Sequence, residues 1–152
     1  MANVNHSTLS DPYLHEPKGV ASASSGDVYL ANGSGSGTWT SRQSMLTVQF
    51  PDISSASNLY VPIPYAGTIT KIQSALTAAI SGGDAVFTIT NSSGSSMGTL
   101  TITQSGSAAG DVDTLTPSSN NTVTAGTFIK IACAGAPSSH VETCIVICVD
   151  GS

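Results

Sequence analysis

Short runs in which apolar and polar residues alternate follow one another from Met45 to the end of the chain, with turn residues between them. Alternation with a period of two is typical of half-buried β-strands. The clearest runs cover residues 46–50, 59–63, 86–90, 99–103, 128–133 and 141–149, with weaker ones at 112–115 and 120–124. About eight strands joined by Gly- and Ser-rich turns predict an all-β domain over residues 41–152, a jelly-roll or Greek-key β-sandwich.

Two segments allow a more specific prediction. Pro62 and Pro64 interrupt the hydrogen-bonding pattern of residues 59–63, so we expect an edge strand there, because proline has no N–H to donate. Residues 68–80 leave two alternatives open: one long strand with a bulge, or a strand followed by a helical turn over 74–79.

The run 141–149 is apolar on both of its faces. One face carries Val141, Ile145, Ile147 and Val149, and the other carries Cys144, Val146 and Cys148. A strand with two apolar faces has to be covered on both sides. Because the core of a sandwich covers only one of them, we expect the N-terminal arm or a neighbouring subunit to cover the second.

Residues 1–40 follow a different pattern. No helical period of apolar residues is present, and Pro12 and Pro17 restrict the residues before them to extended conformations. The segment 32–37 (NGSGSG) is typical of a flexible linker. We therefore expect an extended arm outside the core. Trp39 is interpreted either as an anchor where the arm joins the sandwich or as a platform for a sugar ring.

Composition narrows the classes of function. Charged residues make up 9% of the 152-residue chain, against roughly 25% in an average globular protein, which excludes coiled coils and charged helix bundles. Hydrophobic residues reach 39% and the net charge is −5, so the chain has enough apolar side chains for one folded domain. With four Lys and Arg against nine Asp and Glu, we expect no basic surface for a nucleic acid partner.

The three cysteines, Cys133, Cys144 and Cys148, lie near the end of the chain. On a regular strand Cys144 and Cys148 are about 13 Å apart, beyond the roughly 7 Å that a disulfide allows. We expect all three to be free thiols in the core of a protein that folds in a reducing compartment. The first residues lack the pattern of a signal peptide, and no apolar run approaches the roughly 20 residues of a membrane span. We therefore expect a soluble protein without a membrane partner.

Several weak candidates for chemistry each have a simpler structural interpretation. His140 and Cys144 lie close in sequence, but a Cys–His dyad also needs a third, orienting group. Asp111 and Asp113 suit an acid–base pair, although two solvated carboxylates at a turn explain them better. Asp84 follows two glycines without the further oxygen ligands that calcium requires. We expect no enzyme activity, no metal and no cofactor.

Five segments of the chain carry a family resemblance. They are residues 11–20 (DPYLHEPKGV), 26–33 (GDVYLANG), 35–39 (GSGTW), 61–69 (VPIPYAGTI) and 102–113 (ITQSGSAAGDVD). The first three closely resemble the N-terminal arm of capsid decoration (cement) and head-fibre proteins of tailed phages. The last two resemble the sandwich domain that accompanies this arm. The arm segments are the more specific, because β-segments rich in Gly, Ser and Thr recur in tail fibres and spikes.

The resemblance implies a structural protein on the outer capsid surface of a virion, assembled in the cytoplasm of a bacterial host. In such proteins the β-domain forms a homotrimeric knob and the arm contacts the major capsid protein, which stabilises the shell. Carried over to this chain, the capsid-contacting residues are Leu14, His15, Glu16, Pro17, Lys18, Gly19, Val28, Tyr29 and Leu30. Cys144, Val146 and Cys148 are then expected at a trimer contact or in the core.

A second interpretation is a binding module, namely a head fibre or tail-associated knob that recognises host or environmental glycans. The two functions place the decisive contacts in different segments. A decoration protein uses residues 10–40, whereas a glycan-binding knob uses loops such as 92–96 or 136–140.

Overall fold

The computed structural model describes residues 22–34 and 36–151 of the chain. The chain divides into two compact units, Met1–Arg42 and Gln43–Ser152. The predicted capsid-contacting residues from Leu14 to Gly19 lie outside the described residues.

The first unit contains a β-hairpin. Its strands β1 (Val28–Ala31) and β2 (Gly37–Thr40) pair antiparallel. The side chain of Asn32 closes the loop between them, because its Oδ1 accepts hydrogen bonds from the backbone N–H of Ser34 (2.9 Å) and of Ser36 (3.2 Å). Asn32, Ser34 and Ser36 of the Gly/Ser segment thus belong to a hairpin loop, which corrects the prediction that the segment is a flexible linker.

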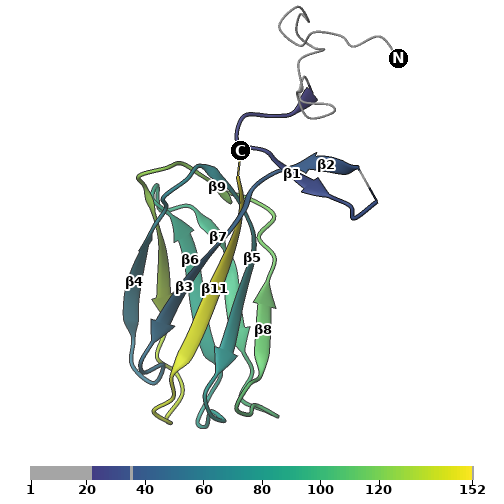
Figure 1. Ribbon diagram of the computed structural model, residues 1–152. Coiled ribbons are helices and arrows are strands. Elements are labelled where there is room, and N and C mark those ends of the chain that lie inside the picture. The colour runs from purple at the N-terminus through teal and green to yellow at the C-terminus, as the bar shows by residue number, and fades with distance from the viewer. Residues whose placement is uncertain (1–21, 35, 152) are drawn as a thin grey trace, which may run out of the picture. The chain divides into compact units, whose positions relative to one another are not determined.

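The second unit is a β-sandwich, as the alternating runs predict. Its strands are β3 (Gln43–Phe50), β4 (Ser57–Pro62), β5 (Gly67–Leu76), β6 (Ala85–Asn91), β7 (Ser96–Ile102), β8 (Val112–Leu115), β9 (Thr122–Val123), β10 (Phe128–Cys133) and β11 (Thr143–Gly151). One sheet has the order β4-β10-β6-β7; the other has the order β3-β11-β5-β8, and β9 also pairs with β5. Figure 1 shows β11, in yellow, between β3 and β5.

The strand order is that of a jelly roll. The chain alternates between the two sheets from β3 to β6, forms the antiparallel hairpin β6–β7, and alternates again through β8, β10 and β11. A jelly roll consists of two Greek keys folded into two facing sheets. The prediction of an all-β fold is therefore confirmed, and the strand order selects the jelly roll.

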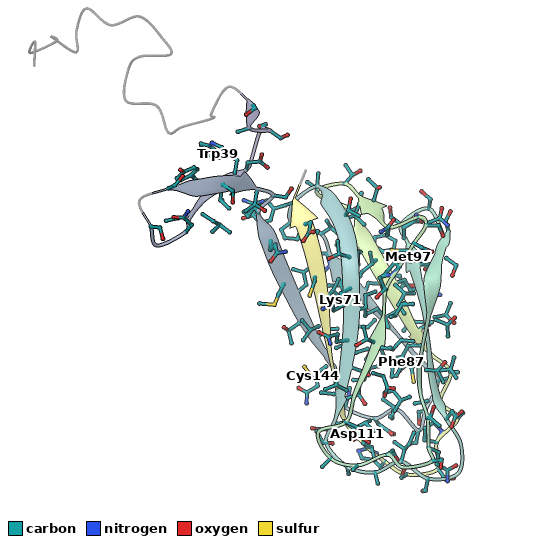
Figure 2. The ribbon with its side chains drawn as sticks, turned by 90° about the vertical axis from the view of Figure 1, so that its right-hand side faces the viewer. Trp39, Lys71, Phe87, Met97, Asp111 and Cys144 are labelled. Atoms are coloured by element: carbon teal, nitrogen blue, oxygen red, sulfur yellow. The ribbon has the colours of Figure 1, made fainter. Side chains whose placement is uncertain are left out.

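The core fills the space between the two sheets. Alternate residues of each strand point into it, so that Ile145 and Ile147 of β11 are fully buried. Phe87 packs edge-on against Phe50, with ring centroids 5.2 Å apart, and Figure 2 shows Phe87 inside the sandwich. Each such buried side chain contributes about 1.5–3 kcal/mol through the hydrophobic effect.

The two specific strand predictions can be compared with the structure. Among the described strands β4 pairs only with β10, which confirms the edge position that its prolines indicate. β5 is a single strand whose register against β11 shifts between Cys148 and Val149, as a bulge requires. The bulged strand is thus the correct alternative, although it ends at Leu76 and no helical turn follows it.

Candidate interaction surfaces

The outward side of β11 forms the centre of an exposed sheet face. Thr143, Ile145, Ile147 and Val149 point into the core and are buried, whereas Cys144, Val146 and Cys148 point away from it and are half-buried. The alternative that these last three residues belong to the core is therefore wrong. The two-residue period of the strand directs them to the side that the second sheet does not cover.

Neighbouring strands extend this face in rows. Cys144 lies between Gln49 of β3 and Ala75 of β5, and Ala75 in turn lies opposite Val112 of β8. We call the surface centred on β11 the β11 outer face; its members are Met45, Thr47, Gln49, Lys71, Gln73, Ala75, Val112, Thr114, Cys144, Val146 and Cys148. Figure 2 labels Lys71 and Cys144 on this sheet.

The β11 outer face exposes apolar side chains over two shallow hollows. Met45 is 74% exposed and Val112 is 57% exposed, and both lie on the same outward side of one sheet as Val146. A hollow of about 240 Å³ lies beside Val112 and Val146, and one of about 220 Å³ lies beside Met45 and Cys148. Lys71 is the only cation among the members of this face. Such a surface suits a broad, mainly apolar partner.

The three cysteines are free, as predicted, but occupy two environments. Cys133 belongs to the core, where its Sγ donates a weak hydrogen bond to the carbonyl of Ile53 at 3.6 Å. Burial raises the pKa of the Cys133 thiol, which keeps it protonated and unreactive. Cys144 and Cys148 lie instead on the β11 outer face, outside the core.

The hairpin of the first unit presents a second set of apolar side chains. Tyr29 of β1 and Trp39 of β2 lie opposite each other, with ring centroids 5.3 Å apart. Val28 is 38% exposed and Leu30 is 57% exposed. Of the predicted capsid-contacting residues, these three positions of β1 are the ones that the structure describes. Trp39 has a structural place in the hairpin, against Tyr29.

His140, one half of the Cys–His candidate, contacts a carboxylate. His140 Nδ1 lies 3.1 Å from Asp52 Oδ2, and the His140 side chain is 75% exposed. Hydrogen bonds from the Ser54 side chain and backbone lower the pKa of Asp52, and the nearby His140 lowers it further. The structure therefore joins His140 to a carboxylate rather than to Cys144.

The acidic candidates take part in turns. Asp111 accepts a hydrogen bond from the N–H of Ala108 at 2.6 Å, and Asp84 accepts one from the N–H of Gln104 at 2.7 Å. Burial raises the pKa of Asp113, and the charge of Asp111 raises it further. Among the residues that the structure describes, no group of three His, Cys, Asp or Glu side chains is placed to hold a metal ion. Within the same residues no helix is long and apolar enough to span a membrane.

The four-stranded sheet carries an aromatic pair that the sequence interpretation did not single out. Tyr60 of β4 and Phe128 of β10 lie on its outer face with ring centroids 5.3 Å apart and planes at 74°. A hollow of about 100 Å³ adjoins Phe128. The sequence did carry a signal for this pair. Both rings occupy positions of an alternating strand that point outward and are normally polar.

Comparisons with known proteins give distant likenesses only. No protein-family model matches the chain, and no curated protein matches it. A chain from the disulfide-linked pili of Bacillus endospore appendages aligns with a TM-score of 0.39 and 16% identity, covering 74% of this chain and 90% of that chain. A chain from the virus-like particle of the Macrobrachium rosenbergii extra small virus aligns with a TM-score of 0.33 and 12% identity, covering 73% of this chain and 80% of that chain. At these scores neither likeness assigns a role to this chain.

Proposed function

We propose that this protein is a structural decoration protein of a phage head, a homotrimer that binds the outside of the capsid and stabilises the shell. The observation that carries the proposal is the division of the chain. The segments that resemble the arm of decoration proteins belong to Met1–Arg42, a unit separate from the jelly roll. In this proposal the first unit anchors the protein to the capsid, and the jelly roll forms the knob. The protein acts by binding, without enzymatic chemistry or a cofactor.

The first unit is suited to contact a major capsid protein. In a two-stranded hairpin each strand has one unpaired edge, and such an edge accepts an additional strand from a partner. The exposed Leu30 and Val28 side chains add apolar contact area to those backbone hydrogen bonds. Because a lone hairpin is only marginally stable in water, docking onto the capsid also supplies the missing packing.

The β11 outer face is suited to contact a second copy of the chain. It is apolar around Val146, Cys144 and Ala75, and within residues 43–151 no other segment covers it. The resemblance supplies the number of subunits, three. Joining three hairpin units makes binding multivalent, so weak single contacts with the capsid still hold the trimer on the shell.

The first test is to measure the mass of the full chain by light scattering and then to sediment it with undecorated phage heads. We expect a trimer that pellets with the heads at a fixed stoichiometry and raises the temperature at which they release their DNA. A monomer, or a trimer that stays in the supernatant at saturating concentrations of heads, contradicts the proposal.

A further inference from the structure

We propose that the outer face of the four-stranded sheet binds a saccharide, with one pyranose ring packed on Tyr60 and Phe128 and an acidic substituent near Lys130. The aromatic pair lies on the sheet opposite the β11 outer face, so this site is separate from the surface proposed for trimer contacts. The inference does not depend on capsid binding.

The aromatic pair supplies the stacking surface. Tyr60 is 57% exposed and Phe128 is 39% exposed, and their T-shaped arrangement leaves ring surface open to solvent. The face of an aromatic ring carries partial negative charge, which attracts the weakly positive C–H groups on the flat side of a pyranose. Covering this exposed aromatic surface with a sugar ring removes it from water, which lowers the free energy through the hydrophobic effect.

The adjoining hollow supplies groups that pair with sugar hydroxyls. Its polar lining includes Ser92, Ser93, Thr122 and Thr124, all exposed, whose side-chain hydroxyls form no hydrogen bond with any residue that the structure describes. A hydroxyl both donates and accepts, which matches the hydroxyl of a sugar. The hollow of about 100 Å³ is smaller than the roughly 300 Å³ of a pocket that encloses a drug-sized ligand, so it receives one edge of a ring.

The charge around the pair indicates an acidic sugar. Lys130 lies directly opposite Tyr60 in the β10–β4 pairing, on the same outward side. It is the single charged residue in the four strands of this sheet, and within the described residues it forms no ion pair. An unpaired ammonium beside an aromatic surface favours a carboxylate-bearing ligand. A single cation is too little for a nucleic acid, whose affinity grows with the number of phosphates neutralised.

The test is calorimetric titration of the full chain with tetragalacturonic acid and with neutral galactotetraose. We expect the acidic tetramer to bind more tightly. Phe128→Leu keeps an apolar side chain in the strand but removes the ring face, so it should weaken binding of the acidic tetramer about tenfold, in line with aromatic stacking. Lys130→Gln should weaken the acidic tetramer severalfold and leave the neutral one unchanged.

The control is Gln104→Ala, which removes an exposed side chain from the loop after β7, outside both proposed surfaces, and should leave both affinities unchanged. Thermal unfolding of each variant establishes that it is folded. Absence of binding by both tetramers at about 10 mM, or equal affinity of the parent chain and a folded Phe128→Leu variant, overturns the site. Equal binding of the two tetramers that is insensitive to Lys130→Gln overturns the acidic ligand.

Discussion

Gly135 follows the last residues of β10 with a φ of 71°, in the left-handed region that side chains other than glycine rarely adopt. A Cβ added there would meet the backbone of Ser55 and Ala56. Because backbone atoms cannot rotate away, Gly135→Ala should lower the free energy of unfolding by about 2–4 kcal/mol, as measured by chemical denaturation.

Gly94 provides the matched control for this substitution. Its φ is 82°, similar to that of Gly135, but an added Cβ meets no atom within 4 Å. Gly94→Ala should therefore show only the conformational cost of about 1 kcal/mol. Equal losses in the two variants would contradict the close approach at Gly135.

Asp113 gives the fold a pH dependence of known sign. Burial, and then the charge of Asp111, raise the pKa of Asp113 above its ordinary 3.8. The folded protein therefore holds this proton more tightly than the unfolded chain, and stability falls as the pH rises from about 3.8 to the raised pKa. Asp113→Asn should raise the melting temperature by about 1–3 °C at pH 7 and leave it unchanged near pH 3. An equal rise at both pH values would point to another cause.

At the residue scale, the sequence predicted which side of a strand each side chain points to better than it predicted whether that side is buried or exposed. The two-residue period correctly separates Cys144 and Cys148 from Ile145 and Ile147. It does not say whether the second side of a strand is covered, because that depends on how many sheets pack against it. Tyr60 was missed for a related reason, since its exposure depends on the edge position of β4 and on its contact with Phe128.

At the element scale, β11 holds two neighbouring residues with opposite surroundings. Ile147 is fully buried in the core, whereas Val146 lies on the β11 outer face. Ile147→Asp should unfold the domain, because a buried unpaired carboxylate costs about 3–5 kcal/mol. We expect the Val146→Asp variant to keep the circular dichroism spectrum and melting curve of a folded domain. Light scattering should show monomers of this variant in place of the proposed trimer.

The two aspartates are each other's control, because they introduce the same charge one residue apart. A folded Ile147→Asp trimer would mean that β11 is placed with the wrong face inward. A Val146→Asp variant that remains trimeric would remove the β11 outer face from the subunit contact.

Individual strands were predicted correctly where a short stretch of sequence is enough to define them. The runs at 112–115 and 128–133 coincide with β8 and β10 because short alternating segments bounded by turn residues suffice to define a strand. The β1–β2 hairpin was missed because its loop is rich in Gly and Ser, like a linker, and the side-chain hydrogen bonds of Asn32 that close it are invisible in composition. The sheet order was also beyond reach, since it rests on pairings between distant segments such as β3 and β11.

At the scale of the whole molecule, different surfaces are suited to different binding tasks. We propose that the β11 outer face contacts other copies of the chain, that the opposite sheet face binds a saccharide, and that the first unit binds the capsid. The jelly roll supports this separation because it offers two outward sheet faces around one core. Because only 9% of the residues are charged, the proposed contacts rely mainly on apolar side chains, hydroxyl groups and backbone hydrogen bonds.

We propose that the first unit anchors the protein to the capsid. The most direct measurement compares the full chain with residues 43–152 alone in co-sedimentation with undecorated heads, after light scattering has established the mass of each. We expect residues 43–152 to remain a folded trimer, because the core and the β11 outer face lie within them, and to stay in the supernatant while the full chain pellets. A truncated trimer that pellets with the heads at the occupancy of the full chain would contradict an anchoring role of the first unit.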